Sequence, residues 1–97
     1  MTERGAARFS VVVPALNEAE TIGDVLRDLR GLTDDLIVGD GRSTDRTAEI
    51  ARAEGARVVQ DRGRGKGDAI RAGLDAARHP IVVFIDVNTM RSGRYGS

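Results

Sequence analysis

The chain has 97 residues, which is enough for one small domain with a modest core. Fifteen basic side chains balance fifteen acidic ones, so no net field attracts nucleic acid or anionic lipid, and we expect no nucleic-acid partner. The absence of cysteine excludes disulfides and thiolate metal sites. With no long apolar run and no cleavable signal, the sequence predicts a soluble protein and fits a cytoplasmic location.

The first segment predicts a strand followed by an amphipathic helix. A β-branched run predicts the strand over residues 9–13, and Pro14 ends it by removing a ladder donor. Asn17 and Glu20 are spaced as a capping box, so the helix is expected to begin there and to stop at Gly31. Its apolar positions recur with the helical period and predict one buried stripe, made of Ile22, Val25, Leu26 and Leu29.

The middle of the chain repeats this alternation. A short apolar run predicts a second strand over residues 36–38. The following helix is expected from about Ser43 to Gly55, because hydroxyl and acidic residues begin helices and glycine ends them. Residues 57–60 then predict a short third strand.

The last part predicts a loop, a helix and a strand. The segment Asp61–Gly67 has three glycines and three cations in seven residues, which is typical of a surface loop. A third helix with small residues on one side follows it. The most apolar run, 81–85, predicts the fourth strand, and Asp86 ends it. Residues 87–97 have no periodic pattern and predict an irregular tail.

This alternation predicts an α/β fold, namely a three-layer, Rossmann-like domain with a mostly parallel sheet and right-handed crossovers. In such sheets, ligands bind beyond the carboxyl ends of the strands. The stretch 36–47 occupies that position, because a buried strand stops at Asp40 immediately before a helix start. We therefore expect the acids that follow the first, second and fourth strands to face one crevice.

Each polar candidate also has a structural explanation. The capping box alone accounts for Asn17, and Glu18 fits as a first-turn acid that complements the helix dipole. Asp40 before a glycine is typical of an ordinary turn. The glycine loop around Lys66 matches neither the P-loop nor the G-x-G-x-x-G pattern. The functional interpretation depends on the conjunction of these residues.

Four ordered segments together resemble the nucleotide-sugar half of family 2 glycosyltransferases. They are Val11-Val12-Val13-Pro14-Ala15-Leu16-Asn17-Glu18, Asp40-Gly41-Arg42-Ser43-Thr44-Asp45, Gly65-Lys66-Gly67 and Phe84-Ile85-Asp86. Within this family the chain is similar both to polyprenyl-phosphate sugar transferases and to glucosyl-3-phosphoglycerate synthases. The resemblance implies a partial GT-A domain, in which residues 1–86 are the nucleotide-sugar-binding part.

The resemblance also implies an activity. Members of the family transfer a sugar from a nucleoside-diphosphate donor, here UDP- or GDP-linked, with Mg²⁺ or Mn²⁺. The acceptor is unknown, and a polyprenyl phosphate or a small phosphorylated acid is compatible with the resemblance. By the matching motifs, the resemblance implies that the residues in contact with the nucleoside are Pro14, Ala15, Asn17, Glu18 and Asp40. It also implies that Lys66 lies near the nucleotide.

The metal motif departs from the family pattern. In the family, an Asp-x-Asp motif holds the divalent cation that offsets charge on the leaving diphosphate. Here the corresponding residues are Asp86, Val87 and Asn88. The amide oxygen of Asn88 can ligate a hard cation but brings no charge, which leaves the strength of metal binding open.

The family pattern continues beyond this motif with an acceptor site and, in inverting members, a catalytic base. None of that is recognisable in 87–97, so the catalytic residues are unknown and we expect a truncated or frame-shifted product. The alternative is a non-catalytic remnant that binds nucleotide weakly or self-associates. Self-association would use the unpaired strand at the edge of the sheet and the exposed apolar surface. A nucleotidyltransferase is disfavoured, because it would need a glycine-rich signature directly after the first strand.

Overall fold

The structure is a computed structural model that describes residues 8–61 and 66–87. Strands and helices alternate along the chain, as predicted. The elements are β1 (Phe9–Ala15), α1 (Ala19–Leu29), β2 (Leu36–Asp40), α2 (Thr47–Ala53), β3 (Arg57–Gln60), α3 (Lys66–Ala76) and β4 (Ile81–Phe84).

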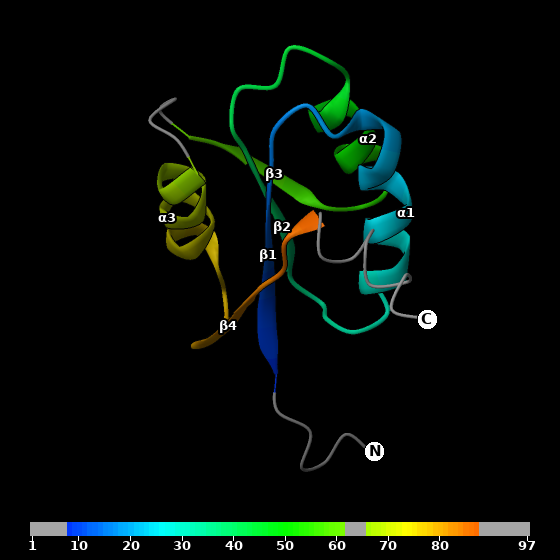
Figure 1. Cartoon of the computed structure of the whole chain (residues 1–97). Coiled ribbons are helices and arrows are strands. Elements are labelled where there is room, and N and C mark those ends of the chain that lie inside the picture. The colour runs from blue at the N-terminus through cyan, green and yellow to red at the C-terminus, as the bar shows by residue number, and fades with distance from the viewer. Residues whose placement is uncertain (1–7, 62–65, 88–97) are drawn as a thin grey trace, which may run out of the picture.

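The four strands form one parallel sheet in the order β3-β2-β1-β4. Helices α1 and α2 pack together on one face of this sheet, and α3 covers the other face (Figure 1). The three-layer α/β fold with a parallel sheet is therefore confirmed. Because all strands run the same way, their carboxyl ends lie at one edge.

The hydrophobic core explains why the chain adopts this arrangement. Side chains alternate along β1, so Val11, Val13 and Ala15 join the core beneath α1 and α2, whereas Val12 faces α3. The stripe predicted on α1 is buried throughout: Ile22, Val25, Leu26 and Leu29. Burying this stripe against the sheet stabilises the helix more than its short length alone could.

The prediction that Pro14 ends the first strand was wrong. Strand β1 continues to Ala15, with Pro14 opposite Gly39 of β2. The ladder bonds of β1 alternate between its neighbours, so the nitrogen of Pro14 faces the β4 side, where strand pairing stops at Val12. The missing donor of proline therefore removes no ladder bond.

Two predicted helix starts also differ from the structure. The N-cap of α1 is Glu18, without a side-chain cap bond, so the capping box that begins at Asn17 is wrong. Helix α2 begins at Thr47, four residues after Ser43. The end of α1 agrees with the prediction, because Gly31 directly follows its C-cap residue, Arg30. The residues before α2 are held by the loop that follows β1, which competes with helix formation.

A buried polar cluster ties α3 to the sheet at the edge opposite the carboxyl ends. The Asp35 carboxylate is 2% exposed and accepts hydrogen bonds from Ser10 Oγ (2.6 Å), Arg57 Nη2 (2.7 Å) and the Arg78 backbone N–H (2.8 Å). Burial alone raises the pKa of Asp35, but these bonds together with the charge of Arg57 outweigh it and lower the pKa to about 2. The cluster therefore holds an ionised carboxylate inside the fold.

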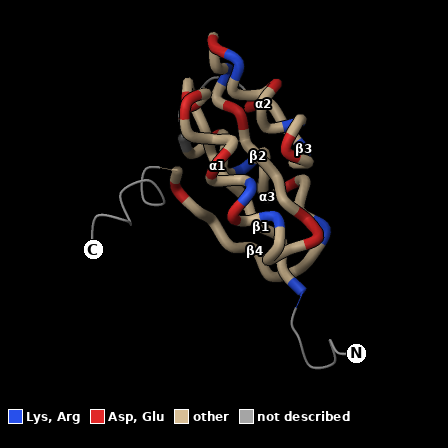
Figure 2. Tube along the Cα trace, turned by 90° about the vertical axis from the view of Figure 1, so that its right-hand side faces the viewer, with Lys and Arg blue, Asp and Glu red and all other residues tan. Residues whose placement is uncertain are grey.

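Charges of both signs are interspersed along the trace of the described residues (Figure 2). This distribution agrees with the zero net charge of the sequence. Within residues 8–61 and 66–87, none of the helices has the length and hydrophobicity that a membrane crossing requires.

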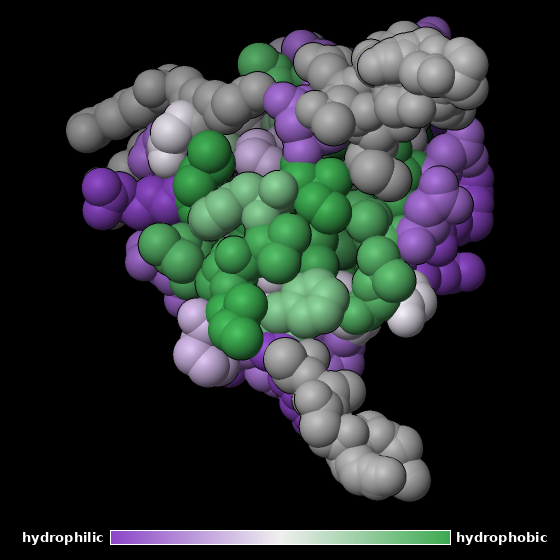
Figure 3. Space-filling view, turned by 60° about the horizontal axis from the view of Figure 1, so that its bottom comes forward, coloured by the Kyte–Doolittle hydropathy of each residue, from purple (hydrophilic) through white to green (hydrophobic). Residues whose placement is uncertain are grey.

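One face of the molecule carries a group of apolar side chains over β4 (Figure 3). Three residues of this strand expose much of their surface: Ile81 (50%), Val83 (38%) and Phe84 (43%). In the described part of the chain, β4 is an edge strand that pairs with β1 alone. Exposed apolar edges of this kind favour association with another chain segment.

Candidate nucleotide-binding site

The candidate site is built where β1 and β2 end side by side. Ala15 pairs with Asp40 in register, and the Gly41 backbone N–H donates to the Ala15 carbonyl at 2.8 Å. The loop after β1 and the loop after β2 therefore leave the sheet together, at the edge where open α/β sheets bind ligands.

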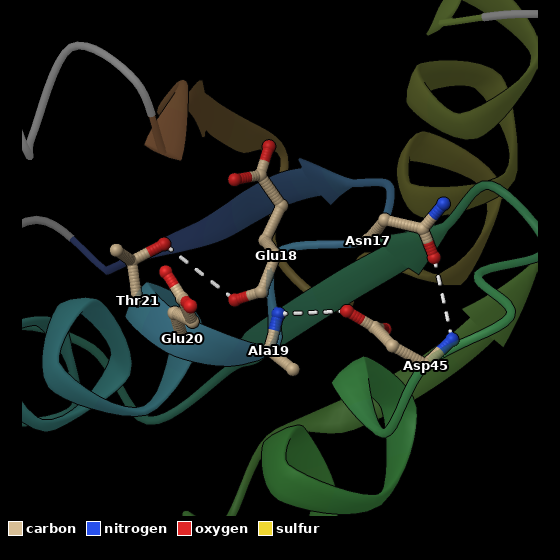
Figure 4. Close-up of a pocket in the computed structure, with 6 residues that line it drawn as sticks. All are labelled: Asn17, Glu18, Ala19, Glu20, Thr21 and Asp45. Atoms are coloured by element: carbon tan, nitrogen blue, oxygen red, sulfur yellow. Dashed lines mark hydrogen bonds between the residues drawn. The ribbon is translucent and has the colours of Figure 1, made fainter.

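Asn17 joins these two loops. Its Oδ1 accepts a hydrogen bond from the backbone N–H of Asp45 at 3.3 Å (Figure 4). The same oxygen accepts from the Thr44 N–H (2.8 Å), and the Asn17 backbone N–H donates to Ser43 Oγ at 2.8 Å. The amide thus binds across the crevice between the loops, instead of capping α1. A capping box and this bridge use the same residue type, so the local sequence could not separate them.

The start of α1 is capped by the neighbouring loop. The Ala19 N–H donates to Asp45 Oδ2 at 3.1 Å, and the Glu18 N–H donates to Thr47 Oγ1 at 2.8 Å. Thr47 Oγ1 in turn donates to Asp45 Oδ1, and this bond is the main cause that lowers the pKa of Asp45. The Asp-x-Thr spacing was a visible signal, but sequence reasoning assigned its capping only to α2.

The backbone is strained at two positions in these loops. Asn17 has φ +53° and Arg42 has φ +66°, and they are the described non-glycine residues with positive φ. Asparagine tolerates this conformation, whereas arginine adopts it at a cost. Strain of this kind persists only where surrounding contacts fix it, and it gathers at functional sites.

Asp40 is placed at the end of β2, as predicted, with its carboxylate already bound on both oxygens. Ser43 donates to Oδ1 from its hydroxyl (2.7 Å) and its backbone N–H (3.3 Å). Gln60 Nε2 donates to Oδ2 at 2.7 Å, and Asp40 is only 2% exposed. Sequence reasoning missed Gln60, although a parallel sheet places the last residue of β3 opposite Asp40.

A polar cavity of about 220 Å³ opens beside the loop after β1. Figure 4 shows its lining residues, with the Glu18 carboxylate turned away from Asp45. Two predicted site residues, Asn17 and Glu18, are in this lining, and Asp40 and Asp86 are not. The full lining is Asn17, Glu18, Ala19, Glu20, Thr21 and Asp45.

The remaining predicted site residues lie at or near the same sheet edge. Asp86 comes two residues after β4, and the Ile85 N–H just before it donates to the Val12 carbonyl at 3.0 Å. Lys66 is the first residue of α3. Asn88 lies outside the described residues. Within the described ranges, no three His, Asp or Glu side chains gather as a metal site.

We expect Asn17→Ala to destabilise the protein by about 2 kcal/mol. The substitution removes the amide that bridges the two loops, and alanine, unlike asparagine, has no side-chain hydrogen bond to support a positive φ. Asn17→Gly, which adopts this φ freely, should lose only about 1 kcal/mol. Urea unfolding of the two variants measures both values. Equal losses would show that the positive φ carries no cost.

Together, the parallel sheet and the paired loops at its carboxyl edge define an α/β protein of the Rossmann-like class, a fold that binds ligands at that edge. Residues 10–88 match the family described as Glycosyl transferase family 2. The chain therefore belongs to this family, as the sequence motifs indicated.

Several named proteins are similar to the chain. Glycosyltransferase AglJ of Haloferax volcanii is 44% identical over 79 residues, covering 78% of this chain and 26% of that protein. Glucosyl-3-phosphoglycerate synthase of Mycolicibacterium paratuberculosis is 46% identical over 90 residues, covering 80% and 27%. The dolichyl-phosphate hexose transferase of Haloferax volcanii is 42% identical over 89 residues, covering 89% and 39%. The chain thus spans about a quarter to two fifths of these relatives.

Solved structures agree with this assignment. Glucosyl-3-phosphoglycerate synthase of Mycobacterium tuberculosis, in complex with Mn²⁺, UDP and glucosyl-3-phosphoglycerate, has a TM-score of 0.77 and 42% identity, covering 87% of this chain and 34% of that one. The same enzyme with UDP has a TM-score of 0.78 and 41% identity, covering 88% and 35%. It has also been solved with Mg²⁺ and UDP, at 42% identity and a TM-score of 0.77, covering 87% and 34%.

Proposed function

We propose that residues 1–86 form the nucleotide-sugar-binding part of a glycosyltransferase that uses a UDP-linked sugar donor. The observation that carries this proposal is the joined pair of loops, centred on Asn17 and Asp45, at the carboxyl ends of β1 and β2. Solved relatives of the same fold were obtained with UDP, which favours UDP over GDP.

The nucleoside is held by the predicted residues along the two loops. Asp40 supplies a carboxylate that accepts from a base N–H or a ribose hydroxyl, and the segment Pro14–Glu18 supplies backbone and amide groups beside it. Lys66 begins α3 near the same edge and offers a cation for the diphosphate. The proposed contacts to the nucleotide sugar are therefore Pro14, Ala15, Asn17, Glu18, Asp40, Lys66 and Asp86.

A divalent cation, Mg²⁺ or Mn²⁺, fits this arrangement only when the donor helps to hold it. The described residues contain no self-sufficient metal cluster, and Asp86 offers one carboxylate at the sheet edge. Magnesium is commonly bound by one or two carboxylates together with substrate phosphates. We assign the metal to Asp86 and Asn88 with the diphosphate, where it would offset charge on the leaving group.

The acceptor is proposed to carry a phosphate. Two relatives support this in different ways, because one is a glucosyl-3-phosphoglycerate synthase and another is a dolichyl-phosphate hexose transferase. A small phosphorylated acid and a polyprenyl phosphate share that group. Transfer to 3-phosphoglycerate or to a dolichyl phosphate, assayed side by side, distinguishes them.

Calorimetric titration with UDP and with GDP, each with and without Mn²⁺, tests the proposal. We expect UDP to bind with Mn²⁺ and the Asp86→Ala variant to bind it at least tenfold more weakly, because the metal loses its protein carboxylate. Asp28→Ala, which removes an exposed acid from α1, is the matched control and should bind as the native chain does. Absence of binding in a folded sample would refute the proposal.

A non-catalytic role in self-association is the second candidate. It is favoured by the exposed side chains of Ile81, Val83 and Phe84 on an edge strand. Sedimentation of the same samples separates the two roles. A stable dimer without UDP binding supports self-association alone, whereas metal-dependent UDP binding by a monomer supports the donor site.

A further inference from the structure

The carboxylate of Asp40 is covered by the groups that bind it, so a ligand cannot reach it in this conformation. It is 2% exposed, its Oδ1 is bound twice by Ser43, and its Oδ2 accepts from Gln60 Nε2 at 2.7 Å. Because the carboxylate is buried under these partners, a nucleoside that is to reach Asp40 must move one of the two aside. The structure distinguishes which partner can leave.

Ser43 is held in place by several bonds. Its hydroxyl donates to Asp40 and also accepts the backbone N–H of Asn17 at 2.8 Å, while its own backbone N–H binds Asp40 as well. Moving Ser43 would break the junction between the two loops. Ser43 therefore stays with Asp40 when a ligand arrives.

Gln60 is in a different position. It is the last residue of β3, an edge strand of the described sheet, and its side chain is exposed. An exposed glutamine rotates about its side-chain bonds on a fast timescale without disturbing the backbone. It can therefore leave Asp40 at the cost of one hydrogen bond.

We propose that the Gln60 side-chain amide occupies, in the free protein, the position at Asp40 that the nucleoside base takes when it binds. The base then displaces the amide from Asp40 Oδ2. This inference rests on the proposed function, because it concerns the same donor site. The imide N3–H of uracil is a neutral N–H donor, as is the Gln60 amide, and either satisfies Oδ2. The Oδ2 oxygen of Asp40 thus keeps a donor both before and after the base binds, which avoids the cost of leaving it unpaired.

Such a competitor weakens nucleotide binding by the strength of the bond that must be broken. Removing it in Gln60→Ala leaves Asp40 anchored by Ser43 but opens Oδ2 to the base. We expect UDP, in the presence of Mn²⁺, to bind this variant roughly threefold to tenfold more tightly than the native chain. If Gln60 instead positions Asp40 for the ligand, the same variant binds UDP more weakly.

A second ligand separates competition from a general effect on the site. The analogue 3-methyluridine 5′-diphosphate has no N3–H and cannot replace the Gln60 amide at Asp40. Its affinity should therefore be the same for the native chain and for Gln60→Ala. Leu32→Ala, at an exposed residue beyond the end of α1, is the control variant and should bind both ligands as the native chain does. An equal gain for both ligands, or no gain for UDP, would overturn the inference.

Nuclear magnetic resonance gives a readout that does not depend on affinity. Gln60 is the sole glutamine of the sequence, so its side-chain amide signals are assigned by their loss in Gln60→Ala. These signals should shift toward those of a solvated amide as UDP is added. UDP binding that leaves them unchanged overturns the inference but keeps the proposed function, whereas a folded chain that binds no UDP overturns both.

Discussion

Replacement of Asp35 by asparagine is expected to lower the free energy of unfolding by about 3 kcal/mol. The carboxylate is buried and accepts bonds from Ser10, Arg57 and the Arg78 N–H. Asparagine has one acceptor oxygen in place of two, and its NH₂ group would face donors. It also leaves Arg57 without its counterion. Urea unfolding of the native chain and of the variant measures the difference.

The neighbouring acid provides the matched control. Asp34 is an exposed acid that contacts Arg8 (3.6 Å) and His79 (2.7 Å) at the surface. Exposed pairs of this kind contribute little in water. Asp34→Asn should therefore unfold at nearly the same urea concentration as the native chain, and equal losses at both positions would contradict the assigned role of burial.

Acidic pH should lower the free energy of unfolding of the native protein by protonating Asp35. The pKa of Asp35 falls from an ordinary value near 3.8 to about 2 on folding, so its ionised form stabilises the fold above pH 4. This contribution, about 2 kcal/mol, is lost as the pH falls from 4 toward 2. The stability gap between the native chain and Asp35→Asn should narrow over that range.

Two glycines at the contact between α3 and the sheet, Gly39 in β2 and Gly73 in α3, are expected to tolerate no side chain. A Cβ on Gly39 would lie 2.5 Å from the Ala69 carbonyl oxygen, and one on Gly73 would overlap Val12 Cγ1. The first clash is with helix backbone, which cannot move without displacing α3. We expect Gly39→Ala to destabilise the protein by about 3 kcal/mol and Gly73→Ala by about 2 kcal/mol.

Gly67 is the control in the same helix. Nothing lies within 4 Å of a Cβ added there, so Gly67→Ala should stabilise the protein slightly, by about 0.5 kcal/mol, through helix propensity. Thermal unfolding of the three variants compares the signs directly. Stabilisation by Gly73→Ala would show that α3 lies farther from β1 than the structure places it.

Much of the fold could be predicted because its signals are local. The stripe on α1, the apolar runs of the strands and the glycine that follows α2 each lie within one segment. Gly55, with φ +91°, ends α2 as predicted. The parallel sheet followed from the strand–helix alternation, since parallel strands need crossovers. The family motifs are likewise local, and the comparison confirmed the family that they indicated.

The errors occurred where two distant segments share one group. Asn17 has the sequence of an N-cap, but its amide binds the loop of Thr44 and Asp45, and Asp45 caps α1 from outside. Pro14 predicts the end of a strand, but the pairing of β1 with β4 stops at Val12. The Pro14 nitrogen therefore faces a position where the sheet needs no hydrogen-bond donor. Neither outcome is encoded near the residue concerned.

The sequence by itself determined the α/β class, the strand order along the chain and the residue types at the carboxyl edge. Only the tertiary structure decided that Gln60 covers Asp40 and that Asp35 is a buried anion. Periodicity reports which face of an element is buried, because burial follows the local repeat. Hydrogen bonds between side chains follow from strand register and loop packing, which bring together residues twenty or more positions apart.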